Sequence, residues 1–222
     1  MADLAQRPPP AVIPIRQSTR MATGSRNALV TNYASIDGVR ADVLEYRPFV
    51  PFEPFRTRAT SAWVMLSKAG VSQFAQVGWY EWSTNYRKVF VQYWNGTGYP
   101  IFEWNPNPDN TYSQYYVTYT NNAFYFRNRG TQIKSTPAAF NPDQGEIASE
   151  ITNLVNQMPG DYGAHAWMSY HNMERRLAGS WQNYSPNLVG TSDNTKWYSS
   201  NARGGMNPQR DLVTADKRGD CS

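Results

Sequence analysis

The sequence predicts an all-β protein, a two-layer antiparallel β-sandwich with extended arms at both ends. Between residues 74 and 127, side chains alternate between two faces with a period of two, which is typical of half-buried strands. Turn signals interrupt this pattern at intervals of about ten residues, as expected of a sandwich or barrel. Composition supports the prediction, because aromatic residues make up 14% and charged residues only 17% of the 222 residues. A protein of long helices would contain more Glu and Lys, and a wholly disordered chain would carry more charge.

The individual strands are predicted from this alternation and from the turns between them. Asn95-Gly96 and Asn121-Asn122 are turn signals, and the Asn- and Pro-rich stretch 105–110 predicts a loop. The predicted strands are 60–66, 74–82, 89–94, 99–104, 112–120, 123–127, 166–173, 181–187 and 195–199. The segment 146–158 is ambiguous, since its apolar residues recur at helical spacing while the strands around it favour a strand.

Proline and glycine mark the ends of the domain. Residues 1–30 contain four prolines between positions 8 and 14 and are predicted to form an extended Pro/Arg-rich arm. Residues 31–200 are predicted to form the sandwich, and residues 201–222 an irregular tail. Within the sandwich, Phe49, Phe52 and Phe55 follow a second proline-rich pattern, which suits an extended segment laid on the core.

Charge and hydropathy limit the partners that we expect. The net charge is +4, but arginines are scattered through both arms, so no nucleic-acid partner is expected. No stretch approaches the roughly 18 apolar residues of a membrane span. The first ten residues lack the apolar centre of a signal peptide. Either the protein is not exported by that route or a signal has been removed, and the Asn-, Tyr- and Trp-rich composition fits the second alternative, a secreted or surface-exposed protein.

Metal and disulfide chemistry are not expected. Cys221 is the single cysteine, so the chain has no internal disulfide. His165 and His171 cannot make a four-ligand zinc site alone, and no cofactor motif is present.

Aromatic strands suggest a binding function. Exposed rows of aromatic rings can stack on sugars and anchor protein interfaces. The alternative for each ring is that it fills the core between the sheets. The candidate ligand-binding residues are Trp79, Trp82, Tyr93, Trp94 and Trp104. We therefore expect a non-catalytic module that binds glycans or protein surfaces. A further alternative is an assembly subunit that forms a homo-oligomer through its arms.

Three short patches resemble known peptidases. Residues 74–78, Phe-Ala-Gln-Val-Gly, resemble the strand of the fungal glutamic peptidases (eqolisins) that carries their catalytic glutamine. Residues 146–150 share the Glu-x-x-x-Glu spacing of the eqolisin glutamate strand, and residues 91–94 are similar to the aromatic strand between them. Gln157-Met158-Pro159-Gly160 resembles the neprosin domain and uncharacterised secreted bacterial proteins. The resemblance implies a concanavalin-like jelly roll.

The same resemblance implies an alternative function, an endopeptidase working at acid pH. Gln76 would be the catalytic amide. The eqolisin pattern indicates Glu150 as its partner and the neprosin pattern indicates Glu146. The glutamate would activate water as a general base while the amide stabilises the oxyanion. Burial would raise the glutamate pKa, which suits acid conditions. The structural alternative is that both glutamates lie on a solvated sheet face.

Overall fold

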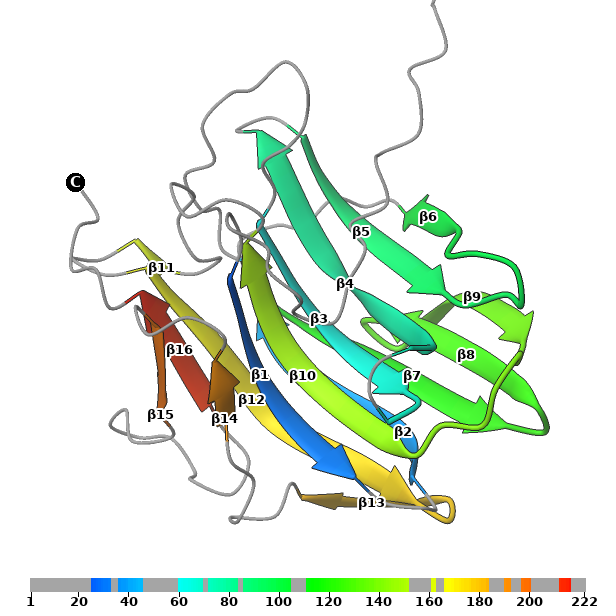
Figure 1. The fold of residues 1–222 in the computed structure, drawn as a ribbon. Helices are drawn as coiled ribbons and strands as arrows, with labels where there is room; N and C mark the ends of the chain where they lie inside the picture. Colours follow the sequence, from blue (N-terminus) through cyan, green and yellow to red (C-terminus); the bar gives the residue numbers. More distant parts are fainter. Residues whose placement is uncertain are drawn as a thin grey trace, which may run out of the picture.

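The computed structural model describes residues 25–32, 36–45, 60–69, 72–83, 86–104, 111–151, 161–162, 166–183, 190–192, 197–200 and 212–216. These residues form two antiparallel β-sheets that pack face to face (Figure 1). No helix long and apolar enough to cross a membrane occurs in this part of the chain. The predicted all-β sandwich is confirmed.

The first sheet contains seven strands. In spatial order these are β14 (Gly190–Ser192), β1 (Ser25–Asn32), β10 (Gln144–Ile151), β3 (Thr60–Ser67), β4 (Phe74–Ser83), β5 (Tyr86–Tyr93) and β6 (Ile101–Trp104). Strand β10 therefore lies between β1 and β3, far from its neighbours in sequence. This crossover brings the glutamate strand beside the strands that precede it by 70 residues or more in the chain.

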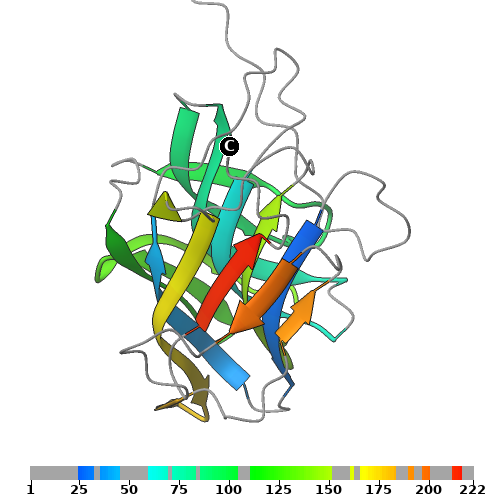
Figure 2. The same cartoon turned by 90° about the vertical axis from the view of Figure 1, so that its left-hand side faces the viewer.

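The second sheet contains nine strands. Along its main path these are β15 (Trp197–Ser200), β16 (Leu212–Asp216), β12 (Ala166–Leu177), β2 (Ile36–Leu44), β7 (Tyr112–Thr120), β8 (Ala123–Asn128) and β9 (Thr131–Pro137). Two short strands, β11 (Asp161–Tyr162) and β13 (Ser180–Asn183), pair with β12. Figure 2 looks onto the side of the sandwich where β15, paired with β16, approaches β1 and β14.

Most predicted strands are present, and six further strands, β1, β2, β9, β11, β14 and β16, were not anticipated. The ambiguous segment is strand β10 up to Ile151. Strands β2, β9 and β14 lie within the predicted sandwich, whereas β1 lies in the stretch expected as an arm and β16 in the expected tail. The paired strands thus extend beyond residues 31–200. The phenylalanine-rich segment 49–55 and the stretch that holds His165 lie outside the described residues.

The core lies between the two sheets. Alternate residues of each strand point inward, so that one set of side chains is buried in a single apolar cluster. The first sheet contributes Val64, Val77, Trp79, Val91 and Ile147, and the second contributes Val39, Tyr115, Val117, Phe124, Phe126 and Tyr170, among others. Because these positions face inward, the residues between them must lie on the outer faces of the sheets.

Charged side chains close one end of this core. The Glu45 carboxylate is fully buried, accepts a hydrogen bond from the Tyr115 hydroxyl and pairs with Arg129 at 2.8 Å. Glu81, equally buried, lies 3.3 Å from Arg87. Such pairs are costly to break, since removing one partner leaves a buried charge uncompensated.

Candidate functional site

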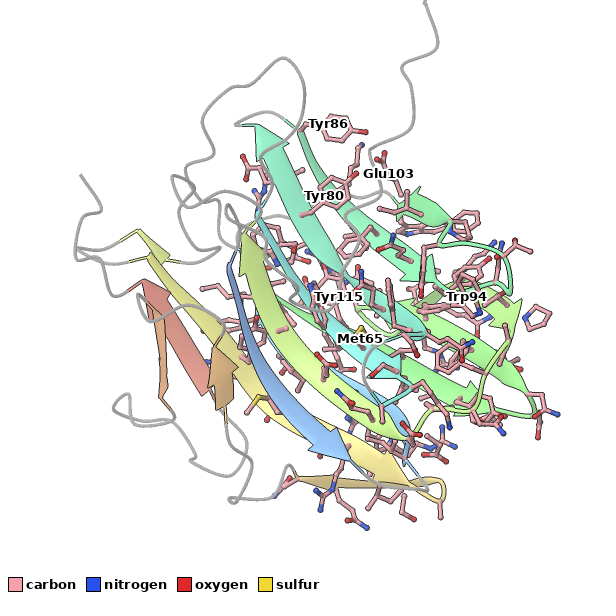
Figure 3. All side chains as sticks on the ribbon, in the orientation of Figure 1. Met65, Tyr80, Tyr86, Trp94, Glu103 and Tyr115 are labelled. Carbon is pink, nitrogen blue, oxygen red and sulfur yellow. The ribbon has the colours of Figure 1, made fainter. Side chains whose placement is uncertain are left out.

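Polar side chains form one row across the outer face of the first sheet. The strand register aligns Glu146 of β10 with Met65 of β3, Met65 with Gln76 of β4, and Gln76 with Gln92 of β5. Their sequence neighbours point into the core, so all four side chains project to the opposite face. Figure 3 shows Met65, which lies between the two strands that carry the glutamate and the glutamine.

The row places Glu146 and Gln76 two strand spacings apart. Neighbouring strands lie about 4.8 Å apart, so the two Cα atoms are about 10 Å apart across Met65. Both side chains point to the same face of the sheet, with the buried Met65 side chain between them. The exposed fraction is 0% for Glu146 and 3% for Gln76, so the pair lies in a low-dielectric environment.

Hydrogen bonds orient both groups. Gln76 Nε2 donates to Gln92 Oε1 at 2.9 Å, and Gln92 Nε2 lies 3.5 Å from the carbonyl oxygen of Tyr99. Gln144 Nε2 donates to Glu146 Oε1 at 2.7 Å. Gln92 and Gln144 therefore act as positioning residues for the amide and the carboxylate.

One polar atom of the row has no partner. In the part of the chain that the structure describes, no donor reaches the buried Gln76 Oε1. Leaving a buried polar atom unsatisfied costs about 1–3 kcal/mol, and such atoms are rare enough to require an explanation. An amide oxygen left open on the same sheet face as a carboxylate is suited to accept a hydrogen bond from water.

Apolar side chains surround the polar row. They form a second buried cluster on this outer face, consisting of Trp63, Met65, Phe74, Tyr80, Phe90 and Ala148. Gly78 lies against Trp63 so closely that a Cβ atom on it would lie 2.6 Å from both Cα and Cβ of Trp63. The absence of a side chain at Gly78 therefore sets the packing of this face between Gln76 and Tyr80.

Glu150 occupies a different position on β10. Its backbone pairs with Ser61 of β3, which in turn pairs with Tyr80 of β4. It lies four residues along the strand from Glu146, so its Cα atom is about 16 Å from that of Gln76. The register thus brings Gln76 together with Glu146, the partner in the neprosin pattern, and not with Glu150.

The aromatic candidates are divided between the core and the surface. Trp79 is fully buried between the sheets, where its indole N–H donates to the carbonyl oxygen of Leu44 at 3.1 Å. Tyr93 is also a core residue and stacks on Phe126. The structure therefore places these two rings in the core rather than on a binding face.

Two other aromatic candidates lie nearer the surface. Trp94 is half-buried, with its ring centroid 4.9 Å from that of Tyr99, and is labelled in Figure 3. Trp104 on β6 is 42% exposed. The backbone of Trp82 belongs to β4, and its side chain lies outside the described residues.

No metal site accompanies the polar row. Among the described residues, no group of three or more His, Cys, Asp or Glu side chains is arranged to hold a metal ion. His171 lies on the second sheet, where its Nε2 atom is 3.0 Å from the Tyr112 hydroxyl.

Comparison with known proteins gives a match in fold only. No protein family matches the chain, and no curated protein is similar to it in sequence. Scytalido-glutamic peptidase with a peptide-based transition-state analogue matches with a TM-score of 0.62 at 11% identity, covering 88% of this chain and 98% of the peptidase. SCP-B, a member of the eqolisin family of peptidases in complex with the tripeptide Ala-Ile-His, matches with a TM-score of 0.57 at 13% identity and the same coverage.

The chain shares its β-sandwich fold with the eqolisin glutamic peptidases. A β-glucanase from Bacillus licheniformis is more distant, with a TM-score of 0.41 at 11% identity over 87% of this chain and 71% of the glucanase. The resemblance suggested by the short patches is confirmed at the level of architecture.

Sequence reasoning missed the positioning residues of the row. Gln92 and Gln144 have the same alternation phase as Gln76 and Glu146 in strands that are otherwise apolar or aromatic. A polar residue at every second position of a buried strand is a detectable signal, because burying an amide is costly unless it is hydrogen-bonded.

Proposed function

We propose that the protein is a glutamic-type peptidase in which Glu146 and Gln76 hydrolyse a peptide bond. One observation carries this proposal. The strand register aligns the two residues across Met65 on one sheet face, and the buried Gln76 Oε1 has no donor among the described residues. Scytalido-glutamic peptidase and the eqolisin SCP-B, with TM-scores of 0.62 and 0.57, are peptidases of this type, which supports the choice of reaction class.

The proposed reaction begins with a water molecule between the two side chains. The Glu146 carboxylate takes a proton from this water, whose oxygen adds to the carbonyl carbon of the substrate. The carbonyl π electrons move onto oxygen, and the resulting oxyanion accepts a hydrogen bond from Gln76 Nε2. Glu146 then transfers its proton to the amide nitrogen. The C–N bond breaks, and an amine and a carboxylic acid are released.

In other enzymes, groups with these roles make rate contributions of typical size. General acid–base catalysis typically contributes about 10²–10⁴ in rate, and one oxyanion donor about 10²–10³. Gln92 occupies one N–H of Gln76 and leaves the second for the oxyanion. The bond from Gln144 fixes the orientation of the Glu146 carboxylate.

The test is a hydrolysis assay on a defined peptide mixture between pH 3 and 7, with products identified by mass spectrometry. We expect wild type to cleave a subset of peptides, and Glu146→Gln to lose at least about 10²-fold in rate because the base is removed. Glu174→Gln, the same change on the outer face of the other sheet, is the control and keeps the wild-type rate. Equal rates in wild type and Glu146→Gln, with both proteins folded, would exclude the proposed base.

A second candidate function is non-catalytic binding at the strand β6 edge. Phe102 and Trp104 are 38% and 42% exposed there, and the Lys134 ammonium lies 4.0 Å from the centre of the Phe102 ring. Rings exposed in this way suit a glycan or a protein surface. Binding on a glycan array that is lost in Trp104→Ala but retained in Glu146→Gln would favour this function over hydrolysis.

Secretion and assembly through the arms remain predictions. Detection of the protein outside the cell would test the first. Light scattering on the full chain and on a chain lacking residues 1–24 would test the second, and an unchanged monomer in both would count against assembly.

A further inference from the structure

A carboxylate on strand β6 is held rigidly at the rim of the same sheet face. Glu103 Oε1 accepts hydrogen bonds from the hydroxyls of Tyr80 and of Tyr86, the latter at 3.0 Å. Glu103 Oε2 accepts a further bond from Tyr86 at 2.8 Å. Figure 3 shows the three side chains converging from β4, β5 and β6. The carboxylate therefore has a fixed orientation while remaining exposed.

Among the described residues, no Lys or Arg forms an ion pair with Glu103. Both donors are phenols, and burial together with the Glu103 contact raises the pKa of Tyr80 far above its usual value, so Tyr80 stays neutral. Lys88 lies over the Tyr86 ring at 5.7 Å but forms no ion pair with Glu103. Within the described residues, carboxylates that do pair with Lys or Arg are Asp37, Glu45, Glu81, Asp143 and Glu174.

A fixed, exposed and unneutralised carboxylate is an arrangement suited to bind a cation from outside. The two phenols donate one proton each, that of Tyr86 being shared between the two carboxylate oxygens, so acceptor positions of the carboxylate stay open for an incoming N–H donor. Charge-assisted bonds of this kind are about twice as strong as neutral ones. Since the site is already ordered, little conformational entropy is lost when the ligand binds.

The distance from Glu103 to Gln76, the nearer member of the proposed catalytic pair, matches the length of a short peptide. Glu103 aligns with Phe90 of β5, and Phe90 with Gly78 of β4, two residues from Gln76. Two strand spacings and two residues of rise separate the Cα atoms of Glu103 and Gln76 by about 12 Å. An extended peptide advances about 3.3 Å per residue, so this distance corresponds to three or four residues.

We infer that Glu103, held by Tyr80 and Tyr86, binds the ammonium or guanidinium group of a Lys or Arg three or four residues from the cleaved bond. This inference rests on the proposed function and defines a substrate class for it: peptides with a basic side chain at a fixed distance from the scissile bond. Tyr80 and Tyr86 are positioning residues for the carboxylate.

The experiment uses a cleaved peptide resynthesised as matched pairs, with Lys or Gln placed in turn at each of the four positions on either side of the bond. For wild type, we expect kcat/KM of the Lys peptide to exceed that of its Gln partner by about tenfold at one position and to converge at high salt. Glu103→Gln keeps the acceptors for both phenols but removes the charge, so the ratio falls to about one. Glu103→Asp keeps the charge on a shorter side chain, so its ratio should lie between those of Glu103→Gln and wild type.

Asp42→Asn is the matched control. Asp42 is another carboxylate held by neutral donors, Gln114 at 3.3 Å and Asn172 at 2.6 Å, on the outer face of the second sheet. This variant is expected to keep the wild-type ratio of Lys to Gln peptide. A wild-type enzyme that prefers Lys at no position, or a Glu103→Gln variant that keeps the preference, would overturn the inference.

Failure of the proposed function gives a different result. If wild type cleaves no peptide, hydrolysis is excluded, and the inference is then decided by binding of the same pairs, followed through tryptophan fluorescence. Tighter binding of a Lys peptide that is lost in Glu103→Gln supports the cation site. Equal binding of Lys and Gln peptides overturns it.

Discussion

Replacing Gly78 by alanine should damage the fold at the centre of the proposed site. A Cβ atom on Gly78 would lie 2.1 Å from the carbonyl oxygen of Ala62 and 2.6 Å from both Cα and Cβ of Trp63. Ordinary contacts start near 3.4 Å, and two of these three atoms belong to the backbone of the neighbouring strand. The clash therefore cannot be relieved by a side-chain rotation alone and requires β3 and β4 to move apart.

The expected cost follows from this geometry. Overpacking a core by a methylene typically costs about 1–3 kcal/mol, and a clash with paired backbone belongs at the upper end, so we expect about 3 kcal/mol. In a chain of this size, each kcal/mol lowers the melting temperature by about 2–4 °C. Gly78→Ala should therefore melt about 6–12 °C below wild type.

Urea unfolding followed by circular dichroism, together with a thermal melt, measures this effect. The control is Gly98→Ala, since Gly98 has no neighbour within 4 Å of an added Cβ atom. That variant should change the free energy of unfolding by less than about 1 kcal/mol, because only the entropy of the unfolded chain changes. If Gly78→Ala falls within 1 kcal/mol of wild type, the close approach of β3 and β4 is refuted.

Three further changes have definite outcomes. Burial raises the pKa of Tyr170, so the neutral phenol stabilises the fold below about pH 10, and this stability is lost as the pH rises further. In urea unfolding from pH 9 to 11.5, the free energy of unfolding should therefore fall more steeply with pH for wild type than for Tyr170→Phe, by up to about 1.4 kcal/mol per pH unit. Equal slopes would contradict the burial of this group. Arg129→Met breaks the 2.8 Å pair with the buried Glu45 carboxylate and should cost about 3 kcal/mol in chemical denaturation, whereas no loss would show that the pair adds nothing. Trp104→Ala removes an exposed ring and should leave the melting temperature within 2 °C of wild type, a larger drop indicating that the ring is packed.

The strand architecture was predictable because the periodicity is local. In β4, the inner set Ala75, Val77 and Trp79 alternates with Gln76 and the other outer residues, and the sheet register preserves that alternation. The same logic makes Asn121 and Asn122 a two-residue hairpin turn, where φ is 52° and 56° and asparagine is tolerated.

Strand β2 was missed although it carries a clear signal. Val39, Ala41 and Val43 alternate with Arg40 and Asp42, but the charged residues and the nearby proline-rich stretch concealed the pattern. Its polar outer face is explained by the structure, since Arg40 pairs with Glu174 on that side.

The choice between Glu146 and Glu150 could not be made from the sequence. Both have the same alternation phase, so the period of two does not distinguish them. The decision depends on the register of β10 against β3 and of β3 against β4, which is set by long-range pairing. The same holds for the burial of Trp79 and Tyr93, because a ring on a strand is equally compatible with a core or a surface until the second sheet is placed.

The most direct measurement compares kcat/KM for Glu146→Gln and Glu150→Gln on one cleaved peptide, with wild type alongside. Alignment of Glu146 with Gln76 predicts a loss of at least about 10²-fold for Glu146→Gln and near wild-type hydrolysis for Glu150→Gln. Full activity in Glu146→Gln, or a loss confined to Glu150→Gln, would contradict the assignment.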